Sequence, residues 1–147
     1  MSEQINNAMI SIHSRQEYED AAPDSVDLTT AGALSRTEQG YCVTYEESVL
    51  TGLEGTRTSL DITPKRVVLT RTGGLNSQIV FETGVRHLSL YTTPMGNLEV
   101  GVATRRLHST MGDNGGRLEV DYSIDIDHQM AGENYFSLTV RRTNISQ

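Results

Sequence analysis

The chain has 147 residues, the usual size of one domain, and a domain of that size buries about 70% of its unfolded surface without needing disulfides or a structural metal. Hydrophobic residues make up only 36% of it, with two Phe and no Trp, a lean supply that is typical of β-rich proteins in which one face of each strand is wet. The formal net charge of −7 disfavours general nucleic-acid binding, because an acidic surface repels phosphate backbones.

The first 22 residues contain the only sign of a helix. Ser14–Ala22 has fair helix propensity, but it lacks an apolar stripe along one side. We interpret it as the end of a first strand that runs into a loop, and we leave one helical turn open.

Turn signals then recur along the whole chain. Most of the segments between them are about 8–12 residues long, the spacing of an all-β sandwich or barrel. Asp113–Gly116 is the strongest signal, because Asn-Gly readily supplies the positive φ angles of a tight turn. Nine signals predict ten strands, and they are Pro23–Ser25, Gln39–Gly40, Gly52–Gly55, Thr63–Lys65, Gly73–Gly74, Thr83–Gly84, Pro94–Asn97, Asp113–Gly116 and Ala131–Asn134.

The segments between turns alternate between apolar and polar residues. A period of two places every apolar side chain on one face, as a half-buried antiparallel strand requires. The clearest apolar sets are Leu98, Val100 and Val102; Leu118, Val120, Tyr122, Ile124 and Ile126; and Phe136, Leu138 and Val140. We predict one all-β domain over residues 1–147, an antiparallel up-and-down barrel of about 8–10 strands whose closure removes exposed edges.

Four stretches resemble the YwiB-like family of small bacterial proteins, a domain of unknown function. They are Tyr45–Ile62, Thr70–Gly84, His87–Leu107 and Leu118–Val140, and they occur in the family's order. The resemblance implies a calycin-type, lipocalin-like barrel, and it implies no activity, cofactor or catalytic residue. Because the chain has no Trp, it lacks the Gly-x-Trp signature of true lipocalins.

Two groups of residues suggest catalysis or metal binding, and we interpret both as structural. Cys42 with His87 or His108 could supply a nucleophile and a base, but Cys42 lies mid-segment, where a small buried thiol is common. The densest set of potential metal ligands is Asp125, Asp127, His128 and Glu133. The two aspartates fall on the polar parity of a regular strand, so we expect a solvated strand face.

Three arginines are the best indication of a site. Arg71, Arg86 and Arg106 each share their strand parity with apolar residues, so their guanidinium groups could face the barrel interior. A buried charge would need a carboxylate or a bound anion, and the partners left open are Glu46, Glu82 and Glu99. We favour the alternative that each Arg lies near a strand end and extends to water.

Aromatic and polar side chains add further candidate ligand contacts. His87, Ser89 and Tyr91 alternate on one strand, and Tyr45 and Tyr122 contribute phenol groups elsewhere. Such groups suit a small-molecule pocket, and they suit the outside of a strand equally well. The candidate contacts are therefore Arg71, Arg86, Arg106, His87, Tyr91 and Tyr122.

The sequence favours a binding protein over an enzyme. We expect a small amphipathic or anionic ligand in the mouth or lumen of the barrel, and no cofactor or metal. The alternative is a structural or protein-interaction barrel with a filled core, and a homodimer is left open. One cysteine, no signal-peptide pattern and no apolar run near ~20 residues favour a cytoplasmic protein with no nucleic-acid or membrane partner.

Overall fold

A computed structural model describes residues 6–17, 24–48, 53–74, 76–93 and 96–143, and within these ranges the chain forms strands and no helix. The strands are β1 Ala8–Glu17, β2 Asp24–Arg36, β3 Tyr41–Glu46, β4 Thr56–Ile62, β5 Arg66–Gly73, β6 Ser77–Glu82, β7 Arg86–Thr93, β8 Gly96–Ser109, β9 Gly115–Ile126 and β10 Gln129–Arg142. Ser14–Glu17 thus belongs to β1, as expected, whereas residues 18–22 lie outside the described part.

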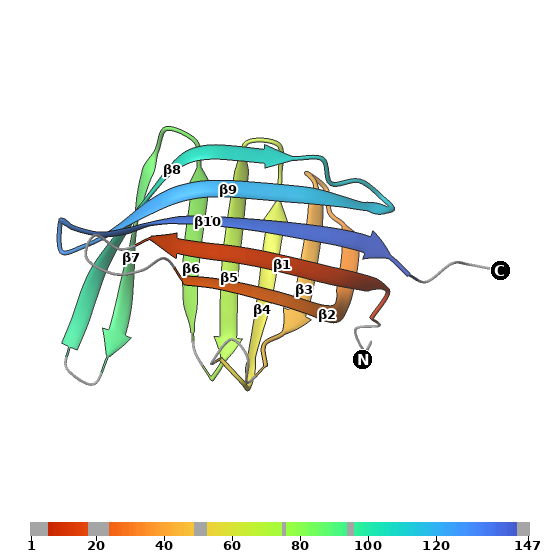
Figure 1. The fold of residues 1–147 in the computed structure, drawn as a ribbon, viewed down its shortest axis with the longest axis horizontal. Coiled ribbons are helices and arrows are strands. Elements are labelled where there is room, and N and C mark those ends of the chain that lie inside the picture. Colours follow the sequence, from red (N-terminus) through yellow and green to blue (C-terminus); the bar gives the residue numbers. More distant parts are fainter. Residues whose placement is uncertain (1–5, 18–23, 49–52, 75, 94–95, 144–147) are drawn as a thin grey trace.

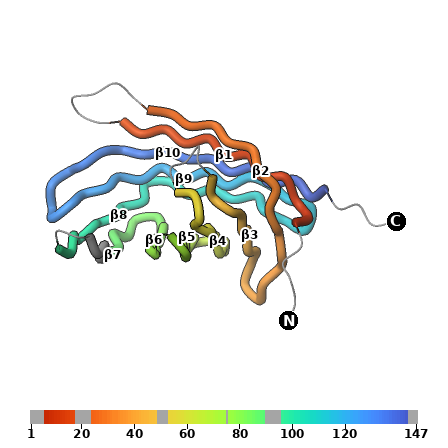
Figure 2. Tube along the Cα trace, turned by 90° about the horizontal axis from the view of Figure 1, so that it is seen from below, coloured from red at the N-terminus to blue at the C-terminus, as the bar shows by residue number. Residues whose placement is uncertain are grey.

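All ten strands belong to one sheet, in the order β6-β5-β4-β3-β2-β1-β10-β9-β8-β7. Every ladder in it is antiparallel, and the first and last strands pair over ten residues, from Ala8 opposite Arg142 to Glu17 opposite Glu133. The sheet folds into two layers whose strands cross at a steep angle, with β3 to β6 behind β1, β9 and β10 (Figure 1; Figure 2). The predicted all-β, up-and-down antiparallel barrel is confirmed.

The barrel is nearly closed rather than closed, because its two edge strands, β6 and β7, share no ladder in the part of the chain described. The connecting turn bonds elsewhere: Thr83 bridges to Thr104 on β8, and the Gly84 N–H donates to the Thr104 carbonyl at 3.1 Å. Beyond the turn, side chains of the described residues bridge this seam, and Ser89 Oγ donates to the Gln78 carbonyl at 2.8 Å. The turn predicted at Thr83–Gly84 is confirmed, because the Val85 N–H donates to the Glu82 carbonyl at 3.0 Å and Gly84 has a φ of 81°. The two strands that it joins do not pair as a hairpin, since the turn is anchored to β8.

A bend in β2 turns the sheet into a barrel. Residues 24–32 of β2 pair with β1, and residues 32–36 pair with β3, so Gly32 is the corner between the two layers. A Cβ at Gly32 would lie 2.4 Å from the Thr44 carbonyl oxygen and 2.3 Å from Ile10 Cδ1. Beyond the corner, the Asn7 side chain replaces β1 as partner, bonding the Leu34 carbonyl at 3.1 Å and the Leu34 N–H at 2.8 Å.

The turn between β9 and β10 lies earlier than predicted. Ile126 pairs with Gln129, so Asp127 and His128 form a two-residue turn, with φ angles of 50° and 71°. Two positive φ angles match the right-handed twist of the flanking strands, as in a type I′ hairpin. The turn predicted at Ala131–Asn134 is wrong: these residues lie within β10, where the register shifts by one residue at a bulge.

The inner face of the barrel holds the hydrophobic core. Ile10, Val43, Val67, Leu118 and Val120 are completely buried there, and the alternation predicted for β9 and β10 points the apolar side chains inward. Three aromatic rings cross the middle of the barrel, with ring centroids 4.7 Å apart for Phe81 and Tyr122 and 5.6 Å apart for Phe81 and Phe136. None of the described segments contains a helix long and apolar enough to cross a membrane.

We predict that Gly32→Ala destabilises the barrel by about 1–3 kcal/mol, because the new Cβ would meet main-chain atoms that cannot rotate away. Urea unfolding followed by circular dichroism measures this. Gly112→Ala is the matched control, since its Cβ would find its nearest neighbour at 3.8 Å, an ordinary contact. Equal unfolding midpoints for the two variants would show that Gly32 does not set the bend.

Candidate functional site

A cavity of about 390 Å³ opens at one end of the barrel, the end at which β1, β3 and β5 finish and β2, β4 and β6 begin. We call it the mouth cavity. Most of its wall is apolar, and Arg71 and Glu47 are its only charged residues among the described lining. The lining residues are Ile12, Ser14, Gln16, Val26, Leu28, Tyr45, Glu47, Leu53, Leu60, Leu69, Arg71, Ile79, Phe81, Tyr122, Ile124, Phe136 and Leu138.

Strand alternation explains the composition of this wall. The inner-facing positions of β1, β2, β5 and β9 continue from the core toward the mouth, and the last of them on β5 is Arg71. Below them, Phe81 and Phe136 close the floor of the cavity against the packed core. At the rim, Val26 remains 40% exposed, so apolar surface reaches the solvent at this end.

One ion pair lies in the cavity wall. Glu47 follows β3, and its side chain is 2% exposed; its Oε2 atom lies 3.8 Å from Nε of Arg71, whose side chain is 23% exposed. The Thr58 hydroxyl also donates a hydrogen bond to Glu47 Oε2. Burial, and then the charge of Glu47, raise the pKa of the neighbouring Tyr45 well above its ordinary value, so this phenol stays protonated.

Two polar atoms beside this pair have no hydrogen-bond partner. Among the described residues, three buried side-chain atoms are unpartnered: Arg71 Nε, Ser77 Oγ and Thr104 Oγ1. Arg71 and Ser77 are opposite each other in the β5–β6 ladder, so both side chains face the same side of the sheet. Buried polar atoms are normally bonded, so hydrogen-bonding capacity is left unused next to the Arg71–Glu47 pair; of these two residues, Arg71 lines the cavity and Ser77 lies behind it on β6.

The structure separates the three candidate arginines. Arg71 lies on the inner face, as its parity predicts, although its acidic partner is Glu47 and none of the three glutamates proposed. Those three pair elsewhere: Glu46 with Arg57, Glu82 with His87, and Glu99 with His128.

Arg86 lies on the outer face, contrary to the inward placement considered for it. Its strand neighbour on the same parity, Leu88, is 55% exposed, so the apolar parity of β7 is the outside of the barrel. The guanidinium crosses over Gly101 and donates to both carboxylate oxygens of Asp125, at 3.0 and 2.6 Å. This bond raises the pKa of Arg86 and lowers the pKa of Asp125, so the pair is a fixed exterior ion pair.

Arg106 also lies outside, and here a bulge overturns the expected parity. Thr104 is opposite Tyr122 on β9, but Arg106 is opposite Asp121, so Arg105 is an extra residue in β8. The bulge switches the face on which every later side chain lies. Arg106 instead pairs with Glu119 at 3.4 Å and Asp121 at 3.6 Å.

The candidate aromatic and histidine contacts are also divided. Tyr122 lines the mouth cavity, whereas His87 lies at the seam, where its Nε2 is 2.9 Å from Glu82 Oε1. Tyr91 belongs to β7 opposite Leu98, and its side chain lies outside the described part. Of the five candidate contacts whose side chains the structure describes, Arg71 and Tyr122 line the cavity. Tyr45 and Glu47 lie there too, and Glu47 gives no sequence signal because it directly follows a strand.

The outer acidic residues at the β9–β10 turn form ion pairs with basic side chains. Asp125 is bound by Arg86, Glu133 by Arg105, and Glu99 lies 3.3 Å from His128. Within the described residues no group of three His, Cys, Asp or Glu side chains is placed to hold a metal ion. These acids stabilise an exterior charge network.

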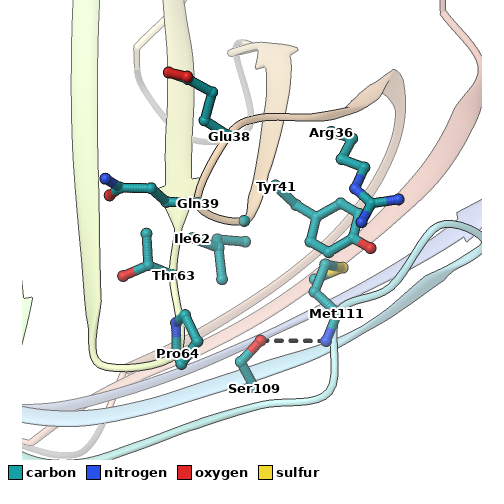
Figure 3. A pocket seen from close by; sticks show the side chains of 10 residues that line it. Arg36, Glu38, Gln39, Tyr41, Ile62, Thr63, Pro64, Ser109 and Met111 are labelled. Atoms are coloured by element: carbon teal, nitrogen blue, oxygen red, sulfur yellow. Dashed lines mark hydrogen bonds between the residues drawn. The ribbon is translucent and has the colours of Figure 1, made fainter.

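A second, shallower pocket of about 310 Å³ lies at the other end of the barrel and was not foreseen from the sequence. Figure 3 shows Tyr41 and Met111 facing each other across it, with Arg36 beside them. The Tyr41 hydroxyl donates to Asp113 Oδ1 at 2.9 Å, and Arg36 lies 3.7 Å from the same oxygen. The Arg36 and Asp113 side chains are 73% and 65% exposed, so the mouth cavity is the stronger candidate site.

Ten antiparallel strands around a cavity at one open end define a small, nearly closed β-barrel. The chain belongs to the family described as "Domain of unknown function (DUF1934)", whose model matches residues 10–138. Its fold is similar to that of the ywiB protein from Bacillus subtilis, with a TM-score of 0.81 and 18% identity over 95% of this chain and 93% of the other. No curated protein matches the chain in sequence. The resemblance found in the sequence is thus confirmed.

The thiol of Cys42, the chain's one cysteine, is not activated as a nucleophile. It pairs across the sheet with Ser35 and Asp61, and burial, followed by the charge of Asp61, raises its pKa to about 11. Because only the thiolate reacts, about one molecule in a thousand is reactive at pH 8. We predict that iodoacetamide labels the native protein far more slowly than the urea-unfolded one, and that the native rate rises about tenfold per pH unit up to about pH 10. A native rate equal to the unfolded rate would contradict this.

Proposed function

We propose that the protein is a non-enzymatic binding module that holds a small amphipathic ligand in the mouth cavity. One observation carries this proposal: a cavity of about 390 Å³ whose wall is mainly apolar, with a few polar side chains and, among the described lining, one guanidinium and one carboxylate. Ligand sites are typically apolar concavities with a few placed polar groups, and this cavity fits that description. The cytoplasmic location expected from the sequence is part of the same proposal.

The size of the cavity limits the ligand. Typical small-molecule sites occupy about 300–1,000 Å³, which places this one at the small end. At about 30 Å³ for each water-sized group, it accommodates on the order of a dozen non-hydrogen atoms. An eight-carbon to ten-carbon chain with one polar group would meet the apolar wall and reach Arg71 at the same time.

The open end of the barrel also supports a lipocalin-like mode of use, in which the ligand enters between strand ends. The alternative, an interaction barrel with a filled core, predicts no cavity and an exposed apolar patch. Leu88 and Met130 are the most exposed large apolar side chains, at 55% and 63%. The Arg86–Asp125 ion pair lies between their strands, which interrupts the apolar surface and favours the cavity as the site of function.

Two variants test the binding proposal. Val26→Trp would place a large ring in the mouth cavity, while Val85→Trp would add the same ring at a turn near the other end. Val26 and Val85 are 40% and 39% exposed, so the substitutions are matched in burial. We expect a ligand-library thermal-shift screen to find compounds that raise the melting temperature of the wild type and of Val85→Trp, and not that of Val26→Trp.

Native mass spectrometry of the protein purified from its own host gives an independent measurement. We expect a bound small molecule that is absent from Val26→Trp. If no compound stabilises the wild type and no ligand co-purifies, the filled interaction barrel becomes the better explanation.

A further inference from the structure

The charges in the mouth cavity constrain the chemistry of the ligand that the proposed function requires. Arg71 is the only cation among the described lining residues, and Glu47 is the only anion. The two form an ion pair at 3.8 Å, and the Glu47 side chain is almost completely buried. The Arg71 guanidinium therefore lines the cavity with its positive charge already balanced by Glu47.

An anionic ligand would upset this balance. A carboxylate or phosphate beside Arg71 would leave two negative charges facing one positive charge inside a wall of Leu, Ile and Phe side chains. An excess buried charge is costly, because the low-dielectric surroundings do not replace the water that the charge loses. The chain's formal net charge of −7 adds a long-range repulsion of the same sign.

The hydrogen-bonding capacity at this position is still unused. Arg71 Nε is a donor, and the Ser77 hydroxyl is both a donor and an acceptor; neither makes a hydrogen bond within the described part of the chain. The two residues are opposite each other on β5 and β6 and face the same side of the sheet. An uncharged group that accepts hydrogen bonds would bond the Arg71 guanidinium without adding charge.

We infer that the ligand's polar group is uncharged, a hydroxyl or an amide carbonyl on a medium-length alkyl chain, and that Glu47 selects against carboxylates and phosphates. The Arg71 guanidinium, which lines the cavity, donates to this group, while the chain lies on the apolar wall between Leu28, Leu69 and Phe136. This inference rests on the proposed function, because it assumes that the mouth cavity binds a ligand.

The first experiment compares three probes of equal chain length with the wild-type protein. Decanol, decanamide and decanoate each carry about a dozen non-hydrogen atoms, matching the cavity at about 30 Å³ per group. At about pH 8 decanoate is fully ionised, since carboxylic acids titrate near pH 4. We expect isothermal titration calorimetry to give dissociation constants at least about tenfold lower for decanol and decanamide than for decanoate.

The second experiment removes the counter-charge. Glu47→Gln keeps an oxygen that can accept from Thr58, and it leaves Arg71 unbalanced. We expect the affinity for decanoate to rise about tenfold or more, with little change for decanol. Glu46→Gln is the matched control: it removes the same charge from the adjacent, exposed residue, which pairs with Arg57 outside the cavity. We expect it to leave all three affinities unchanged.

The outcomes separate the two proposals. If decanoate binds the wild type as tightly as decanol does, or if Glu46→Gln and Glu47→Gln change its affinity equally, the inference about charge is overturned while ligand binding stands. If none of the probes binds the wild type or either variant, the proposed function itself loses support. Should Glu47→Gln fail to fold, as judged by circular dichroism, the wild-type ranking of the three probes still decides the inference.

Discussion

The close contact at Gly32 is the constraint on which the rest of the barrel depends. It lets β2 leave β1 and join β3, so that one continuous sheet forms both layers. Without that corner, strands β3–β6 could not cover the inner faces of β9 and β10. Asn7 completes the corner, because its amide satisfies the Leu34 backbone where β1 no longer reaches. The pairing of β1 with β10 then continues the same layer through β9 and β8 to β7, so that the barrel meets itself at the seam between β6 and β7.

The position of the cavity follows from how this barrel is filled. Two Phe and no Trp supply few large side chains, and both Phe residues lie in one aromatic cluster with Tyr122. Aliphatic residues fill the half of the barrel beneath that cluster to complete burial. Toward the mouth, the inner positions become Ser14, Gln16 and Arg71, which are too polar to pack against one another. The cavity is therefore the part of the interior that the chain has no apolar volume to fill.

Local patterns in the sequence predict the strands well and the faces less well. Alternation identifies the inner set on β9, from Leu118 to Ile124, because no bulge interrupts that strand before its end. It misplaces Arg106, since the bulge at Arg105 follows from tertiary packing and leaves no local signal. It cannot orient Arg86 either, because period two defines two faces without stating which is inner.

The sequence does not predict the turn at Asp127–His128, because neither residue is a glycine, and Gly132 marks a bulge instead. Alternation could not identify Glu47 as the partner of Arg71 for a related reason: Glu47 follows β3, where the strand parity no longer applies.

A buried ion pair is an unusual way to stabilise a small barrel. Replacing such a pair with apolar residues is often neutral or stabilising, since desolvation offsets much of the Coulomb attraction. The seventeen residues that line the mouth include enough Leu and Ile for an all-apolar wall to be within easy reach of the sequence. Glu47 and Arg71 lie instead beside the unpartnered Ser77 hydroxyl, at the end of the barrel that is open to solvent. Because such a pair adds little net stability over apolar residues, it fits the proposal that a charge-balanced guanidinium binds an uncharged polar group and disfavours an anionic one.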